Sequence, residues 1–471
     1  MLLRFVAEIH NSFKKLSLLL FGLPLYSIES TFYCRKITIF NKLIIKSKLY
    51  SDYPFYDNEF TSFHSFSDFL TNTVNASLKP VLLWIDQGLG GGTQSYCLNK
   101  FKEYKNSYII VRLQYFHQYD SFVISCPNGE SYTGFTLSFD EVTALLDKIS
   151  FTKIVINSLV AYRNVKDVLS YIHQLSIKNS SLKIIYNVHD FFFICPNCNL
   201  VDSSGKFCGF TTDHDCLSCI TFYKSKQPDY ENKLFYGEYV NPSQWRSMWN
   251  KFLLDDVDEV VCFSKSSCEL VSIFYRNISE KIKLIPHLVR PLRAVNIEPH
   301  NCVNIAVLGK VDSIPKGKSV VDQLSISIDK YNKAFAFNKN DDNQNISNVN
   351  DDMIDSSTSS HNLYKKVNLF CVGDYVNAPQ NMVVTGEYKR ENLPDILEKK
   401  QIDLVFIPSI CAETFSYTTS EAIAMNVPVA CFNLGGQADQ VSVYPKGFLL
   451  ELSDSTGAAL YKILDFLSKL S

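Results

Sequence analysis

The feature that most constrains the fold is a series of short, largely apolar runs that alternate with amphipathic stretches. Each run is apolar on both faces and bounded by turn residues, which predicts a buried parallel strand. The stretches between them, such as 139–146 and 165–175, have the spacing of amphipathic helices. This alternation predicts a layered α/β protein. The predicted strands are 80–85, 108–113, 153–157, 183–188, 259–263, 303–308, 367–372, 382–385, 402–407 and 427–432.

The predicted strands fall into two series that are separated near residues 287–300. The simplest architecture is therefore two Rossmann-like domains, one over 79–290 and one over 300–471. Residues 338–362 interrupt the second series with seven Asn, five Asp and five Ser. Such a segment buries too little apolar surface to order itself, so we expect a disordered insertion between a helix and a strand.

Residues 1–78 form a basic and aromatic extension ahead of the first series. Its first 50 residues carry eight basic and only two acidic side chains. Two interpretations stay open. The extension is either an arm that contacts a membrane surface or a partner, or a segment packed on the body of the protein.

Charge and hydropathy exclude several classes of protein. The formal net charge is −2, so no global charge drives binding to nucleic acid. No run reaches the roughly 18 apolar residues that a spanning helix needs, and the N-terminus lacks the pattern of a secretory signal. We therefore expect a cytoplasmic protein, with peripheral contact to the inner face of the cell membrane as an open question.

A glycine-rich turn follows the first predicted strand, from Gly88 through Gly90 and Gly91 to Gly92. A turn of this kind between a strand and a helix lets the backbone approach a phosphate, whose charge the helix N-terminus favours. The segment is not a GxGxxG motif and lacks the lysine of a Walker A loop. It is a weak signal when taken alone.

A second motif follows the predicted strand 402–407 and contains Glu413 and Glu421. Ligands of open α/β sheets bind at the carboxyl ends of strands. A carboxylate can accept hydrogen bonds from vicinal sugar hydroxyls, and the start of a helix near 416–420 offers N–H groups to an anion. The alternative is that Glu421 is a first-turn acid that favours the helix dipole and Glu413 is a solvated loop residue.

Two lysines and one histidine also follow predicted strands. Lys310 and Lys316 could clamp a diphosphate and stabilise its charge as it leaves, or they could be ordinary surface lysines. His189 could act as an acid, a base or a hydrogen-bonding group for a substrate, although a lone histidine is more often structural.

Together these spacings resemble the GT-B glycosyltransferases of the large retaining family 4. Glu413 and Glu421 match the E-x7-E motif of that family. Segments 257–264, 281–287 and 427–436 resemble its strand ending in Ser, its linker strand, and its next strand with a glycine loop. The resemblance extends over 79–452, and the His-Asp-Phe-Phe stretch from His189 is similar to the branch that builds bacterial surface polysaccharides such as O-antigen.

The resemblance implies a fold of two Rossmann-like domains that face each other across a cleft, with a nucleotide-diphosphate sugar as the donor. It implies that Glu421 holds the ribose hydroxyls and that Glu413 touches the donor sugar, which His189 faces. The diphosphate would be bound by Gly90, Gly91, Lys310, Lys316 and the backbone N–H groups of Thr414, Phe415 and Ser416. No metal or other cofactor is required for catalysis in this fold.

The implied reaction is sugar transfer with retention to a lipid-linked or growing surface glycan. The alternatives are another GT-B enzyme, such as a sugar-nucleotide epimerase, and a catalytically inactive binding or scaffold protein. Three features depart from the family: Lys310 stands where the family often has Arg, His287-Leu288 replaces Asn-Gly, and the sequence stops soon after the predicted helix 457–470.

Five of the 14 cysteines fall within 195–219, as two CxxC pairs with a single cysteine between them. Paired CxxC knuckles are typical of a structural zinc site. By resemblance to the polysaccharide-building branch, the expected ligands are Cys195, Cys208, Cys216 and Cys219, with His214 as an alternative. Reduced thiols without a metal are the other interpretation.

Overall fold

The computed structural model describes the strands within residues 3–48 and then residues 63–88, 91–116, 121–126, 133–209, 215–226, 241–340 and 365–470. The chain divides into two compact units. The first unit consists of Met1–Cys198, Asp215–Cys262 and Ser272–Lys283, and the second unit of Asn199–His214, Phe263–Val271 and Leu284–Ser471. This division assigns Asn199–His214 and Phe263–Val271, which lie within the predicted first domain 79–290, to the second unit. The predicted domain boundaries stay a prediction.

The first unit has a central eight-stranded sheet with the order β13-β12-β11-β10-β6-β7-β8-β9. Neighbouring strands from β12 to β7 are parallel, and all five predicted strands of the first series are present. The sheet strands are β6 (Val81–Gln87), β7 (Ile109–Phe116), β8 (Ser121–Cys126), β9 (Thr133–Leu137), β10 (Lys153–Ile156), β11 (Lys183–Asn187), β12 (Glu259–Cys262) and β13 (Ile282–Leu284).

The strands β8 and β9 were not predicted, and they extend the parallel sheet with two antiparallel pairings. Every position of β8 is buried, including Ser121 and Ser125. The strand prediction depended on continuous apolar runs, and two of the six residues of β8 are polar. The sequence pattern therefore did not indicate a strand, although the fold buries both serines.

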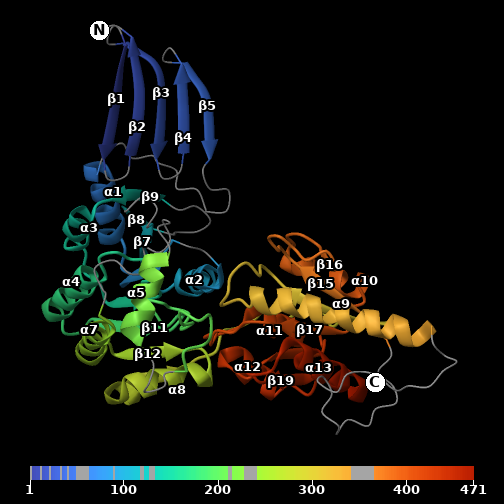
Figure 1. Cartoon of the computed structure of the whole chain (residues 1–471). Helices are drawn as coiled ribbons and strands as arrows, with labels where there is room; N and C mark the ends of the chain where they lie inside the picture. Colours follow the sequence, from blue (N-terminus) through green and yellow to red (C-terminus); the bar gives the residue numbers. More distant parts are fainter. Residues whose placement is uncertain are drawn as a thin grey trace. The chain divides into compact units, whose positions relative to one another are not determined.

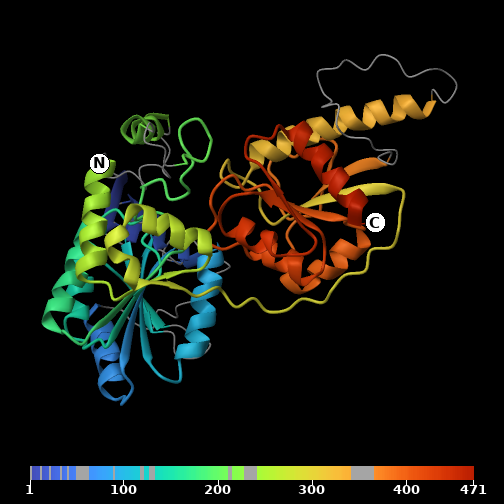
Figure 2. The same ribbon diagram turned by 90° about the horizontal axis from the view of Figure 1, so that it is seen from below.

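Helices cover both faces of this sheet, with α2 on one side and α4 on the other in Figure 2. The ring of Trp84 on β6 meets Phe101 of α2 edge-on, with centroids 5.3 Å apart, a geometry that stabilises aromatic pairs beyond their burial. The described helices of this part of the chain are α1 (Phe63–Asn75), α2 (Gly91–Tyr104), α3 (Phe139–Leu146), α4 (Val165–Lys178), α5 (Cys216–Lys226), α7 (Pro242–Asp255) and α8 (Lys265–Phe274).

The basic extension contains a separate five-stranded antiparallel sheet with consecutive strand order, labelled β1 to β5 in Figure 1. Its strands are β1 (Leu3–His10), β2 (Phe13–Leu20), β3 (Leu23–Thr31), β4 (Cys34–Ile39) and β5 (Lys42–Lys48). None of the described helices is both long enough and apolar enough to cross a membrane. Contact of the extension with a membrane surface stays a prediction.

The second unit is a six-stranded, all-parallel sheet with the order β16-β15-β14-β17-β18-β19. This is the 3-2-1-4-5-6 order of a doubly wound fold. All five predicted strands of the second series are present. The strands are β14 (Cys302–Leu308), β15 (Lys366–Val372), β16 (Met382–Val384), β17 (Leu404–Ile407), β18 (Val429–Phe432) and β19 (Gly447–Leu450). The predicted fold class, α/β with two Rossmann-like domains, is therefore confirmed in the topology of each unit.

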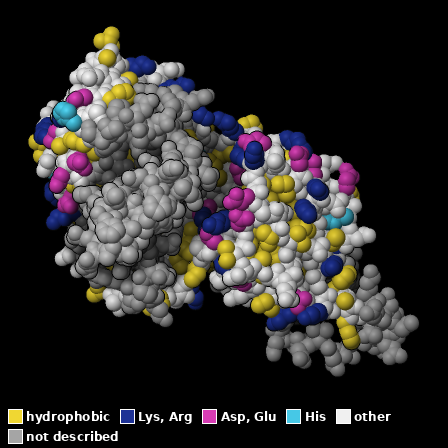
Figure 3. Space-filling view, turned by 90° about the horizontal axis from the view of Figure 1, so that it is seen from above, with side chains coloured by type: hydrophobic (Ala, Val, Ile, Leu, Met, Phe, Trp, Pro, Cys, Tyr) yellow, Lys and Arg dark blue, Asp and Glu magenta, His cyan; other side chains and the backbone are white. Residues whose placement is uncertain are grey.

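Two apolar cores lie on the two faces of this second sheet. Helices α9 (Lys318–Asn340) and α13 (Thr456–Leu470) contribute residues such as Leu324 and Ile463 to one core. Helices α10 (Leu393–Lys399), α11 (Tyr417–Ala424) and α12 (Gly435–Ser442) contribute residues such as Leu397 and Ala422 to the other. On the face of this unit that Figure 3 shows, acidic and basic side chains are interspersed, in keeping with the small net charge.

The predicted disordered insertion at 338–362 falls almost entirely outside the described residues. The long helix α9 extends to Asn340. The next described residue is 365, directly before β15.

We expect Gly317→Ala to destabilise the second unit far more than Gly386→Ala. Both glycines have φ of +80°, so both variants incur the strain of a left-handed backbone, about 1–2 kcal/mol. A Cβ at Gly317 would lie 2.0 Å from the carbonyl oxygen of Pro408, whereas a Cβ at Gly386 would meet nothing within 4 Å. Urea unfolding of the two variants measures the difference, and equal losses of stability would contradict this account of the turn.

Candidate active site

The strand order of the second unit has its switch point between β14 and β17, which are neighbours in the sheet although other elements separate them in sequence. Ligands of such sheets bind outside the carboxyl ends of the strands at this point. The segments that leave these two ends carry Lys310 and Lys316 after β14 and the motif from Ser409 to Glu421 after β17. The topology therefore brings these two predicted groups of site residues to one edge of the sheet.

Glu413 and Lys316 form a close ion pair at this edge. The Lys316 Nζ donates to Glu413 Oε1 over 2.6 Å, and the Ser409 hydroxyl donates to the same oxygen over 2.7 Å. The side chain of Glu413 is 10% exposed and that of Lys316 is 50% exposed. Glu413 is thus a buried, paired carboxylate, and the alternative of a solvated loop residue is wrong.

The loop that carries Glu413 is pressed against the start of α12. The N–H of Gly436 donates to the carbonyl oxygen of Glu413 over 2.6 Å, and a Cβ at Gly435 would lie 2.6 Å from the Glu413 nitrogen. Gly435 also has φ of +67°, which side chains disfavour. The glycine loop predicted from sequence therefore fixes the backbone on which Glu413 sits.

The Lys316 charge decides the protonation state of Glu413. Burial alone would raise the pKa of this carboxyl, but the charge of Lys316 and hydrogen bonds from Lys316, Ser409 and Ser416 outweigh it, so the pKa is lowered. The charge of Glu413 in turn raises the pKa of Lys316. The site presents a carboxylate and an ammonium that are both ionised at neutral pH.

The segment after Glu413 forms the start of α11. Ser416 is the N-cap residue, and its hydroxyl accepts from the N–H of Thr419. Thr414 and Ser416 are buried, while Phe415 is half-buried. The first backbone N–H groups of a helix lack partners inside the helix, so this is the position at which the expected diphosphate contacts of Thr414, Phe415 and Ser416 would be made.

Glu421 is the fifth residue of α11, and the first turn of this helix contains no acid. The alternative that Glu421 is a first-turn acid is therefore wrong. Its side chain is 11% exposed, and Arg390 Nε donates to its Oε1 over 2.6 Å. Burial raises the pKa of Glu421 even though the hydrogen bond and charge of Arg390 lower it.

Lys310 is not drawn into the pair formed by Lys316 and Glu413. Its side chain is 65% exposed, and its Nζ lies 3.1 Å from Asp312. The hydrogen bond to Asp312 raises the pKa of Lys310. Of the two lysines, only Lys316 is fixed by a buried partner.

The substituted linker residue His287 joins an aromatic cluster next to the motif. Its ring centroid lies 4.0 Å from that of Phe263 and 4.5 Å from that of Phe415, and its Nδ1 lies 2.7 Å from the hydroxyl of Tyr417. Burial, with the nearby charge of Glu421, raises the pKa of Tyr417 to about 12. Sequence reasoning noted His287 as a departure but did not connect it to the motif.

In the first unit, His189 follows β11 and is held by a buried polar network. Asn157 Nδ2 donates to the carboxylate of Asp86 over 3.2 Å, so its Oδ1 is the acceptor that faces His189 Nε2 at 2.9 Å. Asp86 is in turn paired with Arg112 over 2.7 Å, and both side chains are at most 1% exposed. Because a carboxylate only accepts, this chain of bonds assigns the ring proton of His189 to Nε2.

The glycine-rich turn is described only in part. Gly90 lies outside the described residues, while Gly91 begins α2 with φ of +74°. Tyr96 on the same helix packs edge-on against the ring of His189, with centroids 4.8 Å apart. This contact places the helix that follows the turn beside His189.

The zinc prediction receives no support from the described residues, among which no three His, Cys, Asp or Glu side chains come together as a metal site would require. Cys195, Cys216 and Cys219 belong to the first unit and Cys208 to the second. His214, the alternative ligand, lies outside the described residues. The zinc site stays a prediction, which elemental analysis of the purified protein can decide.

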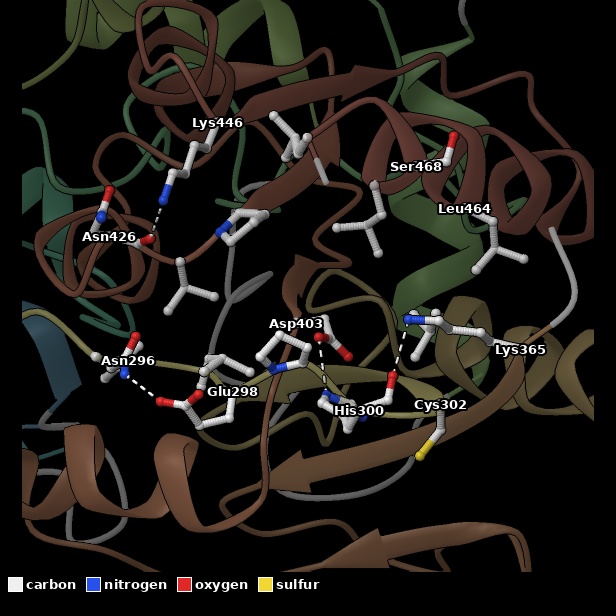
Figure 4. A pocket seen from close by; sticks show the side chains of 18 of the residues that line it. Asn296, Glu298, His300, Cys302, Lys365, Asp403, Asn426, Lys446, Leu464 and Ser468 are labelled. Atoms are coloured by element: carbon white, nitrogen blue, oxygen red, sulfur yellow. Dashed lines mark hydrogen bonds and ion pairs between the residues drawn. The ribbon is translucent and has the colours of Figure 1, made fainter. Parts of the chain in front are cut away.

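A cavity of about 730 Å³ lies at the opposite edge of the second sheet, by the amino ends of the strands. Figure 4 shows that polar groups on its walls bond to one another. Lys365 Nζ donates to the carbonyl oxygen of His300 over 2.9 Å, His300 Nε2 meets Asp403 at 3.1 Å, and Lys446 donates to the carbonyl oxygen of Asn426. None of the predicted site residues lines this cavity.

The comparison with known families agrees with this geometry. Residues 365–469 match the family model of the glycosyl transferases group 1. The match lies within the second unit and contains Glu413, Glu421 and Arg390. A search of the curated proteins found no match.

Several solved structures are similar at low identity. The Anabaena protein HepE in complex with UDP-glucose is 13% identical, with 82% of this chain and 88% of that chain covered and a TM-score of 0.45. A glycosyltransferase from Rickettsia africae is 14% identical, with 84% and 90% covered and a TM-score of 0.46. TarM from S. aureus is 11% identical, with 99% and 73% covered and a TM-score of 0.43.

Asp190, the neighbour of His189, gives the first unit a predictable pH dependence. Burial raises its pKa to about 6, against hydrogen bonds from the Phe192 N–H and the Ser158 hydroxyl. Between its unfolded pKa, about 3.9, and its folded pKa, the folded state binds more protons, so the contribution of Asp190 to stability falls as pH rises.

We therefore expect Asp190→Asn to gain stability relative to the unmodified chain as pH rises from about 5 to 7. Asparagine has no carboxyl to ionise. Its Oδ1 can still accept from the Phe192 N–H, and its Nδ2, in the place of Oδ2, can donate to the Ser158 hydroxyl, which also accepts hydrogen bonds. Thermal unfolding midpoints of both proteins across this range test the prediction. A constant difference between the two midpoints would contradict it.

Proposed function

We propose that this protein is a retaining glycosyltransferase that uses a nucleotide-diphosphate sugar as its donor. The observation that carries the proposal is the ion pair between Lys316 and the largely buried Glu413, with Glu421 on the helix that follows, at the switch point of a doubly wound sheet. The family model of the glycosyl transferases group 1 covers the two glutamates, and the ionised state of the pair supplies the charges that a donor sugar and its diphosphate need.

The donor would bind at the carboxyl edge of the second sheet. Glu421 accepts hydrogen bonds from the vicinal hydroxyls of the ribose, for which a buried carboxylate is suited. Lys316, the start of α11 and the more exposed Lys310 meet the negative charge of the diphosphate. Glu413 accepts from hydroxyls of the sugar while its own charge is balanced by Lys316.

The chemical step would rest on stabilising the leaving group. The bond between the anomeric carbon and the diphosphate oxygen breaks, and the acceptor hydroxyl bonds to that carbon from the same face. The proton of the hydroxyl passes to the departing phosphate oxygen. Lys316 and the helix start stabilise the charge that develops on the diphosphate, and positioning of the two reactants supplies much of the remaining acceleration.

His189 is the first-unit residue that we assign to the donor sugar. The network through Asn157 and Asp86 holds the ring in one orientation with the proton on Nε2. With its Nε2–H donated to Asn157, the neutral imidazole has Nδ1 as its acceptor nitrogen, and Nδ1 is the atom that we assign to a sugar hydroxyl. Gly90 and Gly91 would approach the diphosphate through their backbone.

The acceptor that we propose is a lipid-linked or growing surface glycan of the O-antigen kind. Support for this part comes from the His-Asp-Phe-Phe stretch at His189 and from the basic first 50 residues, which suit the cytoplasmic face of a membrane.

Glu421→Gln should weaken donor binding at least tenfold, because a neutral amide replaces a carboxylate beside the ribose hydroxyls. Isothermal titration with UDP-, GDP- and ADP-sugars measures the affinity, and release of the nucleoside diphosphate measures transfer. Glu398→Gln is the matched control, since Glu398 also pairs with an arginine, Arg293, but lies on the exposed end of α10.

Equal donor affinity in Glu421→Gln and the unmodified chain would refute the assigned site. Failure of the unmodified chain to bind any nucleotide sugar would refute the proposed function itself and favour an inactive relative.

A further inference from the structure

Arg390 is the residue on which the chemistry of Glu421 depends. It lies in the short turn Arg390–Asn392 ahead of α10, 31 positions before its partner in sequence. Its Nε donates to Glu421 Oε1 over 2.6 Å, and its Nη2 donates to the backbone carbonyl oxygen of Arg290 over 2.6 Å. The two bonds hold the planar guanidinium at two points, so its orientation toward Glu421 is set.

The pair is poorly explained as a device for stability. Taking a carboxylate and a guanidinium out of water is costly, and their attraction often only repays that cost. The side chain of Glu421 is 11% exposed and that of Arg390 is 30% exposed, so much of the cost is incurred here. A largely buried carboxylate with a half-buried arginine, at the edge of the sheet where ligands bind, is better explained by a role in holding that carboxylate for a ligand.

With the exception of Arg390, the surroundings of Glu421 disfavour the charged form of its carboxyl group. Burial is the largest influence on its pKa and raises it, and Arg390 is the group that acts in the opposite direction. The neighbouring Tyr388 and Tyr417 have pKa values raised by burial first and then by the charge of Glu421. Without Arg390, the carboxyl would take up a proton at a higher pH than it does now.

We propose that Arg390 is a positioning residue for nucleotide binding, which keeps the Glu421 carboxylate ionised and in one orientation for the ribose diol. Arg390 occupies Oε1, so Oε2 is the oxygen presented to the hydroxyls. This inference rests on the proposed function, because it concerns the same donor site. The carbonyl anchor at Arg290 lies in the segment between β13 and β14, so the position of that segment also bears on the ribose contact.

The test compares the pH dependence of nucleotide binding in Arg390→Gln and in the unmodified chain. The probes are UDP, GDP and ADP, each titrated calorimetrically from about pH 5 to 9 at constant ionic strength. Glutamine keeps a hydrogen-bond donor but removes the charge, so the pKa of Glu421 rises further. Nucleotide affinity requires the ionised carboxylate of Glu421. As pH is lowered, the affinity of the variant should therefore begin to fall at a higher pH than the affinity of the unmodified chain.

Because affinity follows the ionised fraction of Glu421, we expect it to drop about tenfold for each unit by which the pKa of Glu421 rises at pH values below that pKa, and the loss to shrink as pH rises above it. Titration of the nucleotide's own phosphate affects both proteins equally and cancels in the comparison. Arg390→Lys keeps a positive charge without the two-point fork, so it should lose affinity with little change in the pH midpoint.

Two further variants distinguish an effect of Arg390 through Glu421 from a general effect of removing an arginine that pairs with carboxylates. Arg293→Gln removes an exposed arginine that also pairs with carboxylates, Asp395 and Glu398, and should leave nucleotide affinity unchanged. In a Glu421→Gln background, Arg390→Gln should have no additional effect on affinity, because the group through which it acts is gone.

An unchanged pH midpoint in Arg390→Gln, or a full effect of Arg390→Gln in the Glu421→Gln background, would overturn the inference while leaving the proposed function intact. If the unmodified chain binds none of the three nucleotides, the proposed function falls and this inference falls with it.

Discussion

The candidate site depends on keeping two carboxylates ionised where water is largely excluded. A buried carboxylate without a partner takes up a proton, and a neutral acid would lose the charge that makes it a strong acceptor for sugar hydroxyls. Glu413 has Lys316, Ser409 and Ser416 around it, and Glu421 has Arg390. The outcomes differ, since the pKa of Glu413 is lowered and that of Glu421 is raised. Lys316, Ser409 and Ser416 together therefore more than offset the effect of burial on Glu413, whereas Arg390 only reduces that effect on Glu421.

In both units, polar residues lie at the carboxyl ends of neighbouring parallel strands. In the second unit, the carboxyl ends of β14 and β17 carry the charged motif, and in the first unit those of β6 and β10 carry Asp86 and Asn157. The strands are buried and mostly apolar, so the sheets fix the geometry, while polar residues at or just beyond the carboxyl ends of the strands supply the chemistry. His189 follows the neighbouring strand β11 and joins the first-unit network at its edge.

The sequence predicted those strands and candidate site residues whose pattern lies within a short stretch of the chain. The runs that became parallel strands are continuous and apolar, and the E-x7-E spacing located Glu413 and Glu421 because both lie within one loop and helix. Arg390 and Asn157 could not be found in this way, since each lies about 30 positions from the residue it holds. No local pattern links them to Glu421 or His189, and only the order of the strands brings them together. The strand β8 was missed for the opposite reason, because the fold buries serines that locally indicate a loop.

The large cavity at the amino edge of the second sheet has a practical consequence for ligand discovery. A ligand search that selects cavities by size and shape would choose this cavity, yet the predicted donor-binding residues lie at the other edge of the sheet. A compound seated there would raise the melting temperature by binding the folded state without displacing a nucleotide. Thermal stabilisation by itself therefore does not report donor-site occupancy for this protein, and competition with a nucleoside diphosphate is the measurement that distinguishes an inhibitor of transfer from a ligand of the opposite edge.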